Sequence, residues 1–351
     1  MRMQDLEKCQ FVAGRQQGHY ESYFLRGNHP DEPKAFWIRY TIFSPKNHPE
    51  KAIGEIWAMY FDADINTLEE AHENVVAVQE NIPLKDCQFP NTHYAFKIGD
   101  NTLSKVEQAK TEGVSSGSAT LKGHEIRWNL NYKGASDALL LLPEKMYSTA
   151  LPKAKSLVTT PNVLFNGSLV INGKTVNFEN WQGSENHNWG SKHTDEYAWG
   201  QVAGFDGHPN TFLECSTARI KLGPIWSPWM TLAVLDIDGQ RYYFNEVLDT
   251  LKAKALYDYK DSNNQRSWHF KTKNKQASLE VNISAPKEYF AGLYYKNPPG
   301  GCHTCLNSKI ASCEIKLLSE KGKETVLRTR NRAAFEILTD AVDHGIKVRN
   351  S

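Results

Sequence analysis

The sequence of 351 residues lacks any apolar run that approaches the roughly 20 residues needed by a membrane-spanning helix. It also lacks an excess of either charge, because 41 Lys and Arg residues stand against 40 Asp and Glu residues. A balanced charge gives no broad electrostatic attraction to nucleic acid or to an anionic membrane. Residues 1–14 have no apolar core of signal-peptide length. We therefore expect a cytoplasmic protein with no transmembrane segment.

Cysteine is scarce, and the chain's 6 cysteines do not form the dense framework of a small disulfide-rich protein. Cys302 and Cys305 make a single CxxC pair, whereas a structural zinc site needs two such pairs or one pair and two His. The chain has no GxGxxG, GxxxxGK[ST] or GxSxG motif, and no pair of His at i, i+4 with a Glu between them. No aromatic–basic pattern indicates a nucleic-acid-binding module. We expect reduced thiols, no metal, no cofactor and no nucleic-acid partner.

Aromatic residues are abundant, with 9 Trp, 15 Tyr and 15 Phe. Much of the chain alternates polar and apolar residues, as in residues 127–132 (RWNLNY), which is typical of half-buried strands. Tight-turn pairs such as Asn172-Gly173 and Asp238-Gly239 separate these runs. The pattern predicts an all-β protein of antiparallel barrels or sandwiches with little helix. A short helix is expected around residues 335–344, and residues 68–79 are interpreted as half helix and half strand.

A proline-marked stretch, residues 142–161, interrupts the strand pattern near the middle of the chain. We place the domain junction there, which gives an N-terminal β domain at residues 1–160 and a C-terminal β domain at residues 161–351.

Residues 181–205 combine polar and aromatic side chains in two alternating rows. In an extended chain the first row shares one face. It consists of Trp181, Gly183, Glu185, His187 and Trp189. After a polar turn the second row follows, with Tyr197, Trp199, Gln201, Ala203 and Phe205. If the two runs pair as a hairpin, one face has the composition of a ligand pocket. Alternating aromatic residues are also typical of an ordinary core, so a structural role for each single residue stays open.

Two motifs resemble those of a known family. ENHNWG at 185–190, followed by YAWGQ at 197–201, resembles the signature of tocopherol cyclases and the HxWG-type motif of carotenoid hydratases related to hydroxyneurosporene synthase. ESYFLR at 21–26 resembles the EGWYFK stretch that opens tocopherol cyclases. The resemblance implies two lipocalin-like β domains with a hydrophobic cavity. It also implies protonation of an isoprenoid alkene, followed by capture of the cation by water or a phenol. Ser22, Tyr23 and residues 191–194 depart from the family pattern, so the resemblance does not identify the substrate.

On this hypothesis Glu185 or Asp195 is the proton source and His187 is its partner, because a buried carboxyl has a raised pKa and an adjacent imidazole can relay the proton. The aromatic rings form the walls and can stabilise a cation. The expected substrate-binding residues are Glu21, Trp181, Asn188, Trp189, Tyr197, Trp199 and Gln201.

The predicted function is a cofactor-independent hydratase, cyclase or isomerase acting on a hydrophobic, isoprenoid-like or polyene substrate. The alternative is a non-enzymatic carrier of a lipid or pigment with the same fold, which needs pocket walls but no acid. The sequence leaves the oligomeric state open.

Two further features have competing interpretations. Glu214 shares an alternating face with Phe212, so it is a candidate for a second pocket acid, although we expect a bulge or an outward face instead. The loop at residues 223–229 (GPIWSPW) can rim a pocket or plug a barrel end, and we expect the plug.

Overall fold

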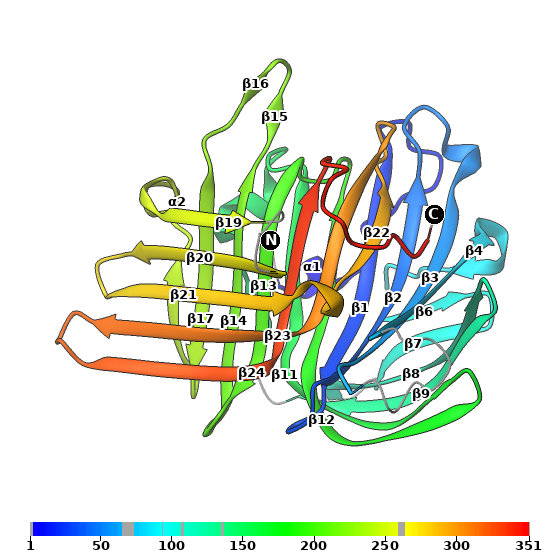
Figure 1. Ribbon diagram of the computed structural model, residues 1–351. Coiled ribbons are helices and arrows are strands. Elements are labelled where there is room, and N and C mark those ends of the chain that lie inside the picture. The colour runs from blue at the N-terminus through cyan, green and yellow to red at the C-terminus, as the bar shows by residue number, and fades with distance from the viewer. Residues whose placement is uncertain are drawn as a thin grey trace.

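The computed structural model describes residues 3–64, 74–92, 94–106, 109–134, 137–258 and 264–350. Within these ranges the chain is almost entirely antiparallel β-structure, with a few short helical segments (Figure 1). The helical segments are α1 (Met3–Glu7), α2 (Val247–Lys252) and the 3-10 turns Pro49–Lys51, Leu84–Asp86, Glu144–Ser148 and Lys287–Tyr289. None of the described helices is long and apolar enough to cross a bilayer. The all-β prediction is confirmed.

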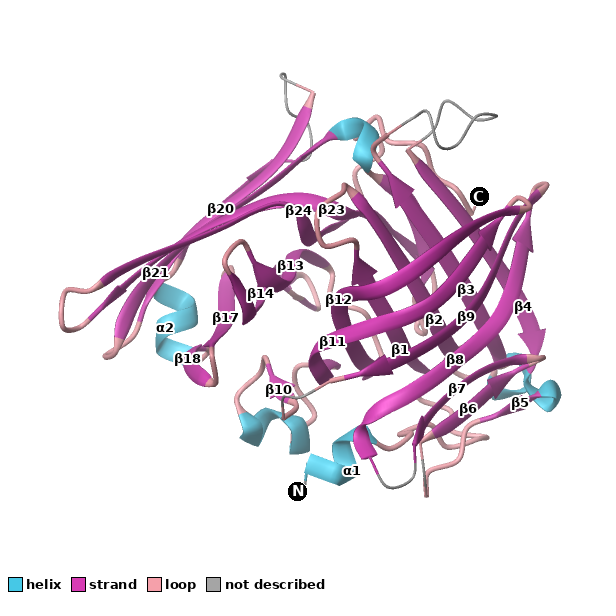
Figure 2. Cartoon of the chain, turned by 90° about the horizontal axis from the view of Figure 1, so that it is seen from below, coloured by secondary structure: helices cyan, strands magenta, loops and turns pink. Residues whose placement is uncertain are grey.

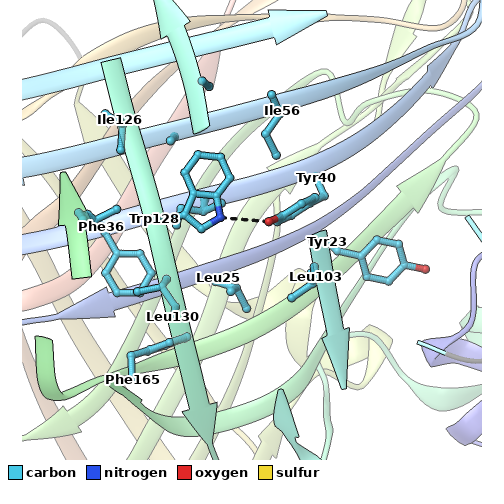
Figure 3. Packing of buried hydrophobic residues seen from close by; sticks show 14 of the residues in the cluster. Tyr23, Leu25, Phe36, Tyr40, Ile56, Leu103, Ile126, Trp128, Leu130 and Phe165 are labelled. Atoms are coloured by element: carbon cyan, nitrogen blue, oxygen red, sulfur yellow. Dashed lines mark hydrogen bonds between the residues drawn. The ribbon is translucent and has the colours of Figure 1, made fainter. Parts of the chain in front are cut away.

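The first large sheet runs in the order β4-β3-β2-β1-β12-β11-β9-β8-β7-β6-β5, with β10 paired to β11. Its strands are β1 (His19–Asn28), β2 (Lys34–Ser44), β3 (Ile53–Asp62), β4 (Val75–Pro83), β5 (Cys87–Gln88), β6 (Ala95–Ile98), β7 (Asn101–Val106), β8 (Ala109–Leu121), β9 (His124–Lys133), β10 (Leu139–Leu140), β11 (Ala154–Ile171) and β12 (Lys174–Gly190). The sheet curls around its own aromatic core (Figure 2). In that core the Trp128 Nε1–H donates to the Tyr40 hydroxyl at 3.1 Å, so a buried indole has its partner (Figure 3).

The second large sheet runs in the order β18-β17-β14-β13-β24-β23-β21-β20-β19, with β22 paired to β23. Its strands are β13 (Glu196–Phe205), β14 (His208–Arg219), β17 (Met230–Ile237), β18 (Gln240–Phe244), β19 (Lys254–Asp258), β20 (Gln265–Lys273), β21 (Ala277–Pro286), β22 (Ala291–Lys296), β23 (Cys302–Ser319) and β24 (Glu324–Thr339). A separate hairpin, β15 (Lys221–Leu222) and β16 (Ile225–Trp226), belongs to neither large sheet.

The chain passes from the first sheet to the second between Gly190 and Glu196. The predicted domain junction at residue 160 lies inside β11, and both β11 and β12 belong to the first sheet. The proline-marked stretch is instead a connection that leads from β10 through a 3-10 turn into β11. Prolines therefore mark a loop within the first sheet there, not the passage between the sheets.

The two sheets pack against each other through the outer face of the first. Along β1, Tyr23 and Leu25 point into the first core, whereas Phe24 joins a second cluster. That second cluster brings Trp37 and Leu338 together from the two sheets. Strands buried on both faces read as continuous apolar runs, which explains the sequence of β2 and β3.

The predicted helix at residues 335–344 is wrong. Strand β24 continues to Thr339 because both of its faces are buried there. Phe335 and Ile337 pack in the core of the second sheet, and Leu338 packs against the first. The predicted helical half of residues 68–79 lies outside the described residues up to residue 73, and β4 begins at Val75.

Candidate active site

The hairpin predicted between the two aromatic rows does not form. Strand β12 pairs with β1 and β11, whereas β13 pairs with β14 and β24. The odd-numbered residues Glu185 and His187 lie opposite Leu25 and Tyr23, whose side chains point into the first core. The even-numbered Asn188 instead faces the second sheet and lines a pocket between the sheets. A pattern of period two predicts faces correctly, but it does not predict which strand lies beside which.

Glu185 has no access to that pocket. It is fully buried, and it accepts hydrogen bonds from the Tyr132 hydroxyl at 2.7 Å and the Thr160 hydroxyl at 2.8 Å. The Lys105 ammonium lies 3.0 Å away. Burial by itself raises the pKa of Glu185, but the Lys105 charge and the hydroxyl donors outweigh it, so the pKa is lowered. A carboxylate held in its charged form inside the barrel is unsuited to donate a proton.

His187 and Glu21 form a second buried cluster at the end of the first barrel. The His187 Nδ1–H donates to the Leu6 carbonyl at 2.9 Å, and Nε2 lies 2.8 Å from Glu21 Oε1. Glu21 also contacts His19 Nε2 at 2.8 Å and accepts from the Gln10 amide at 2.8 Å. Burial raises the pKa of Glu21, yet the two histidines bring it down to about 2. This cluster holds residues 6–10 on the barrel, away from the pocket between the sheets.

The two tryptophans predicted to bind substrate from β12, Trp181 and Trp189, pack in hydrophobic clusters instead of lining the pocket. In the first core Trp181 stacks with Phe36 and makes a tilted ring contact with Phe178. Trp189 packs with Leu6 and Tyr147 below α1.

Asp195 accepts from the Lys192 ammonium at 2.5 Å and from the Lys221 amide at 2.8 Å, so it braces the turn before β13 and the base of the β15–β16 hairpin. Its role as a proton source has no support in this geometry.

A pocket of about 190 Å³ lies between the two sheets. An apolar cavity of ~150 Å³ is known to hold benzene, so this space admits at least a ring-sized group. From the first sheet its lining includes Phe24, Trp37, Arg39, Asn186 and Asn188. From the second sheet it includes Tyr197, Trp199, Glu214, Tyr295 and Glu336. Apolar walls with a few convergent polar groups are typical of small-molecule sites.

Glu214 is the carboxyl that the pocket environment perturbs most clearly. It lies on β14 opposite Gln201 of β13, and its side chain is 3% exposed. The Trp199 Nε1–H donates to Oε1 at 2.8 Å, and the Gln201 amide donates to Oε2 at 2.7 Å. Burial raises the pKa of Glu214 to about 7 despite these two donors. The expectation of an outward face or a bulge was wrong, because β14 is regular here and Phe212 and Glu214 share the face toward the first sheet.

Gln201 connects Glu214 to the first sheet. Its Oε1 accepts from the Ser184 hydroxyl at 2.6 Å and from the Arg26 Nε–H. Its Nε2 also donates to Asn186 Oδ1 at 2.7 Å. These partners leave one orientation for the amide, with its nitrogen toward Glu214. Gln201 is thus a positioning residue behind the pocket.

Glu336 is a second carboxyl in the pocket, and its surroundings differ from those of Glu214. It forms an ion pair with Lys309 at 2.7 Å and accepts from the Asn307 amide at 2.9 Å. The Tyr197 hydroxyl donates to it at 3.3 Å. Glu336 lies opposite Trp199 in the β13–β24 register, so β13 runs between the two strands that carry the carboxyls.

His193 also packs at the pocket. Its ring stacks on Tyr20 with centroids 3.8 Å apart, and it lies 5.9 Å from the ring of Tyr295. Burial and the nearby Arg39 charge lower the pKa of His193 to about 3, so the ring is neutral at ordinary pH. The ring therefore forms part of the pocket wall.

Of the site residues predicted from the sequence, Asn188, Tyr197 and Trp199 line the pocket and Gln201 lies directly behind it. The residues that sequence reasoning did not select come from distant segments, namely Phe24, Trp37, Arg39, Tyr295 and Glu336. For Glu214 the sequence did contain an indication of a pocket position, because this residue alternates with the apolar Phe212. Within the described ranges, no group of three or more His, Cys, Asp or Glu side chains is arranged to hold a metal ion.

Two known proteins are related to this chain by sequence. Two uncharacterized proteins of Mycobacterium tuberculosis strains, Rv0493c and MT0513, are each 23% identical over 207 residues. Those residues make up 58% of this chain and 60% of the relatives, so the match spans less than two thirds of their length.

Three solved structures have similar folds. An AttH-type protein of Nitrosomonas europaea has a TM-score of 0.58 at 11% identity, covering 95% of this chain and 98% of its own. Kievitone hydratase from Nectria haematococca has a TM-score of 0.56 at 9% identity, covering 92% of this chain and 89% of its own. CghA with Sch210972 has a TM-score of 0.57 at 12% identity and the same coverages. Residues 153–337, more than half of the sequence, match the tocopherol cyclase-like family, and the chain belongs to that family.

Proposed function

We propose that this chain is a hydratase or cyclase that acts on a hydrophobic, isoprenoid-like or polyene substrate in the pocket between the two sheets. Family membership supports the reaction class, since tocopherol cyclase is a cyclase and one structural relative is a hydratase. The observation that carries the proposal is Glu214, a carboxyl with a pKa of about 7 that faces an aromatic pocket. Such a group is protonated in about half of the molecules at neutral pH and is matched to general acid catalysis.

The proposed chemistry begins with proton transfer from Glu214 to an alkene carbon. The π electrons form the new C–H bond, and the positive charge remains on the neighbouring carbon. The Trp199 and Gln201 donors stabilise the carboxylate that Glu214 becomes. Water or a hydroxyl of the substrate then forms a bond to the cation and loses a proton, which returns to Glu214. The acid is regenerated, and no redox partner is required.

The walls of the pocket suit a cationic intermediate. The rings of Trp37, Tyr197 and Trp199 line it, and each ring that faces a desolvated cation contributes about 2 kcal/mol of attraction. The Glu336 carboxylate adds negative charge on the same side of the pocket as Trp199. A stabilised cation in a site that excludes bulk water lives long enough for controlled capture.

The proposed proton donor is therefore Glu214, whereas the sequence analysis had assigned this role to Glu185 or Asp195. The carrier function differs from it in one testable respect, because a carrier needs the walls of the pocket but no protonated carboxyl. A panel of isoprenoid and polyene compounds incubated with the protein, followed by mass spectrometry of the products, separates the two functions.

The matched variants for this assay are Glu214→Gln and Glu314→Gln, the latter at a half-buried carboxylate on β23 that pairs with Arg328 at 2.7 Å and lies outside the pocket lining. We expect the first to lose at least about a hundredfold in turnover, in keeping with the usual contribution of a general acid, and the second to retain activity. Compounds that bind to the wild type without being converted would support the carrier. Equal turnover by the two variants would remove Glu214 from the mechanism.

A further inference from the structure

The β15–β16 hairpin exposes an unusual amount of apolar surface. Four large apolar side chains within residues 222–229 are exposed: Leu222 by 51%, Ile225 by 68%, Trp226 by 36% and Trp229 by 38%. The hairpin projects beyond the second sheet (Figure 1). Contiguous exposed apolar surface of this kind marks an interaction site, whereas single exposed residues need no explanation. The loop predicted to plug a barrel end is therefore a projection into solvent.

The hairpin is braced in this exposed position. The Ser227 amide donates to the Ile220 carbonyl at 2.8 Å, and the Ile220 amide donates to the Ser227 hydroxyl at 3.0 Å. The Arg219 guanidinium lies 4.3 Å from the ring centre of Trp226 and 4.5 Å from that of Trp229. These contacts fix the positions of the two rings, while each ring keeps more than a third of its surface exposed.

The charge of the hairpin has one sign. Residues 219–230 contain Arg219 and Lys221 and no carboxylate. Arg219 is paired with Glu196 at 2.6 Å, and the Lys221 ammonium lies 5.8 Å from the Trp226 ring. Among the residues that the structure describes, Lys221 has no ion pair. Tryptophan beside a cation is the combination that suits the phospholipid headgroup region, where the ring is partly buried and the cation meets phosphate.

The hairpin also continues directly from the pocket. Ala218 and Ile220 precede it, Met230 follows it, and all three line the pocket between the sheets. A hydrophobic substrate partitions into membranes, so a pocket that takes it up from there benefits from a mouth close to the bilayer surface.

We propose that the β15–β16 hairpin docks on the surface of an anionic phospholipid bilayer. Ile225 and Trp226 enter the interface, Lys221 contacts the phosphates, and the pocket mouth faces the lipid. The role in substrate uptake rests on the proposed function, but docking itself does not depend on catalysis.

The test is flotation of the full-length protein with phosphatidylcholine vesicles that contain or lack phosphatidylglycerol. We expect the wild type to bind both kinds and to bind the anionic vesicles more tightly. Ile225→Asp places a charge in the interface, so it should lower the partition coefficient at least about tenfold. Leu318→Asp is the matched control, because Leu318 is 45% exposed near the β23–β24 turn, away from the hairpin (Figure 1). It should bind like the wild type.

Three outcomes would overturn the proposal. These are no binding to either vesicle, equal binding by Ile225→Asp and the wild type, or a hairpin-dependent dimer in solution that does not bind vesicles. Glu214→Gln keeps the failure of docking distinct from the failure of the catalytic proposal. It should bind vesicles like the wild type while losing turnover.

Discussion

At the scale of single residues, the surroundings of two buried glutamates determine their chemistry. Glu185 meets a lysine ammonium and two hydroxyl donors, which lower its pKa. Glu214 meets one indole N–H and one amide, which do not offset the cost of burying its charge, so its pKa rises to about 7. In the sequence both residues are carboxyls within predicted strands, and nothing distinguishes their surroundings. The partners Lys105 and Tyr132 of Glu185, and Gln201 of Glu214, lie in other strands, so only the folded structure identifies them.

The raised pKa of Glu214 has a consequence for stability. A carboxyl with a folded pKa of about 7 and an ordinary value of 4.5 stabilises the fold fully below pH 4.5. That contribution is lost as the pH rises through 7, and it amounts to about 3 kcal/mol. We therefore expect the free energy of unfolding to fall between about pH 5 and about pH 8 in the wild type, and to fall less in Glu214→Gln. Urea unfolding of both proteins at the two pH values measures this difference. An equal fall in the free energy of unfolding in the wild type and in Glu214→Gln would contradict the raised pKa.

The indole that contacts Glu214 provides a second prediction. Trp199→Phe keeps an aromatic wall but removes the Nε1–H donor, which lowers the pKa of Glu214 in the wild type. Without it the carboxyl stays protonated to higher pH. The alkaline limb of the pH–rate profile should move upward by a fraction of a unit to about one unit. An unchanged limb, with the fold intact by circular dichroism, would show that Glu214 is not the titrating acid.

At the scale of elements, period-two alternation and turn residues predict most strands and hairpins of this chain. Asn172-Gly173 joins β11 to β12, and Asp238-Gly239 joins β17 to β18, with positive φ at all four residues. The same reasoning fails between β12 and β13, because a polar connection looks alike whether it closes a hairpin or leads from one sheet to another. It fails again at β24, where burial on both faces removes the alternation and leaves a pattern that resembles a helix.

The N-terminal segment is an element that a buried carboxylate helps to hold on the first barrel. Glu21 accepts from the Gln10 amide and pairs with His187, which in turn holds the Leu6 carbonyl. Glu21→Gln should weaken this anchor, and amide hydrogen exchange in residues 6–18 should become faster. The control is Glu50→Gln at an exposed carboxylate. Unaltered exchange in the N-terminal segment of Glu21→Gln would contradict the anchoring role.

Acid should release the same segment in the wild type. The pKa of Glu21 is lowered from 4.5 to about 2, so its stabilising contribution is present above pH 4.5 and is lost as the pH falls toward 2. Hydrogen exchange at decreasing pH, corrected for the intrinsic rate, should show residues 6–18 losing protection in this window.

At the scale of the whole molecule, the site is a product of two sheets packing face to face. Its lining comes from β1, β2, β11, β12, β13, β14, β17, β22 and β24 and their connections. The sequence motifs at 21–26 and 185–201 mark the central strands of this contact. They predict the two-domain β architecture, but no local pattern predicts that Trp37 and Tyr295 meet across the pocket.

A pocket made in this way can be filled without disturbing either core. Ala218 lines the space on β14, so Ala218→Phe should occupy part of it and exclude a ligand. We expect binding of a hydrophobic fluorescent probe to fall at least about tenfold while the unfolding midpoint changes little, because the new ring enters an existing cavity. Retained probe binding in this variant would place the ligand elsewhere.

The most direct test of the central claim is transfer of deuterium from D2O into a bound isoprenoid or polyene, measured by mass spectrometry. Wild type and Asp195→Asn should both incorporate deuterium at the protonated carbon, because Asp195 braces a turn and lies outside the pocket lining. Glu214→Gln should incorporate none above the rate in buffer. Incorporation by Glu214→Gln at the wild-type rate would contradict the assignment of Glu214 as the acid.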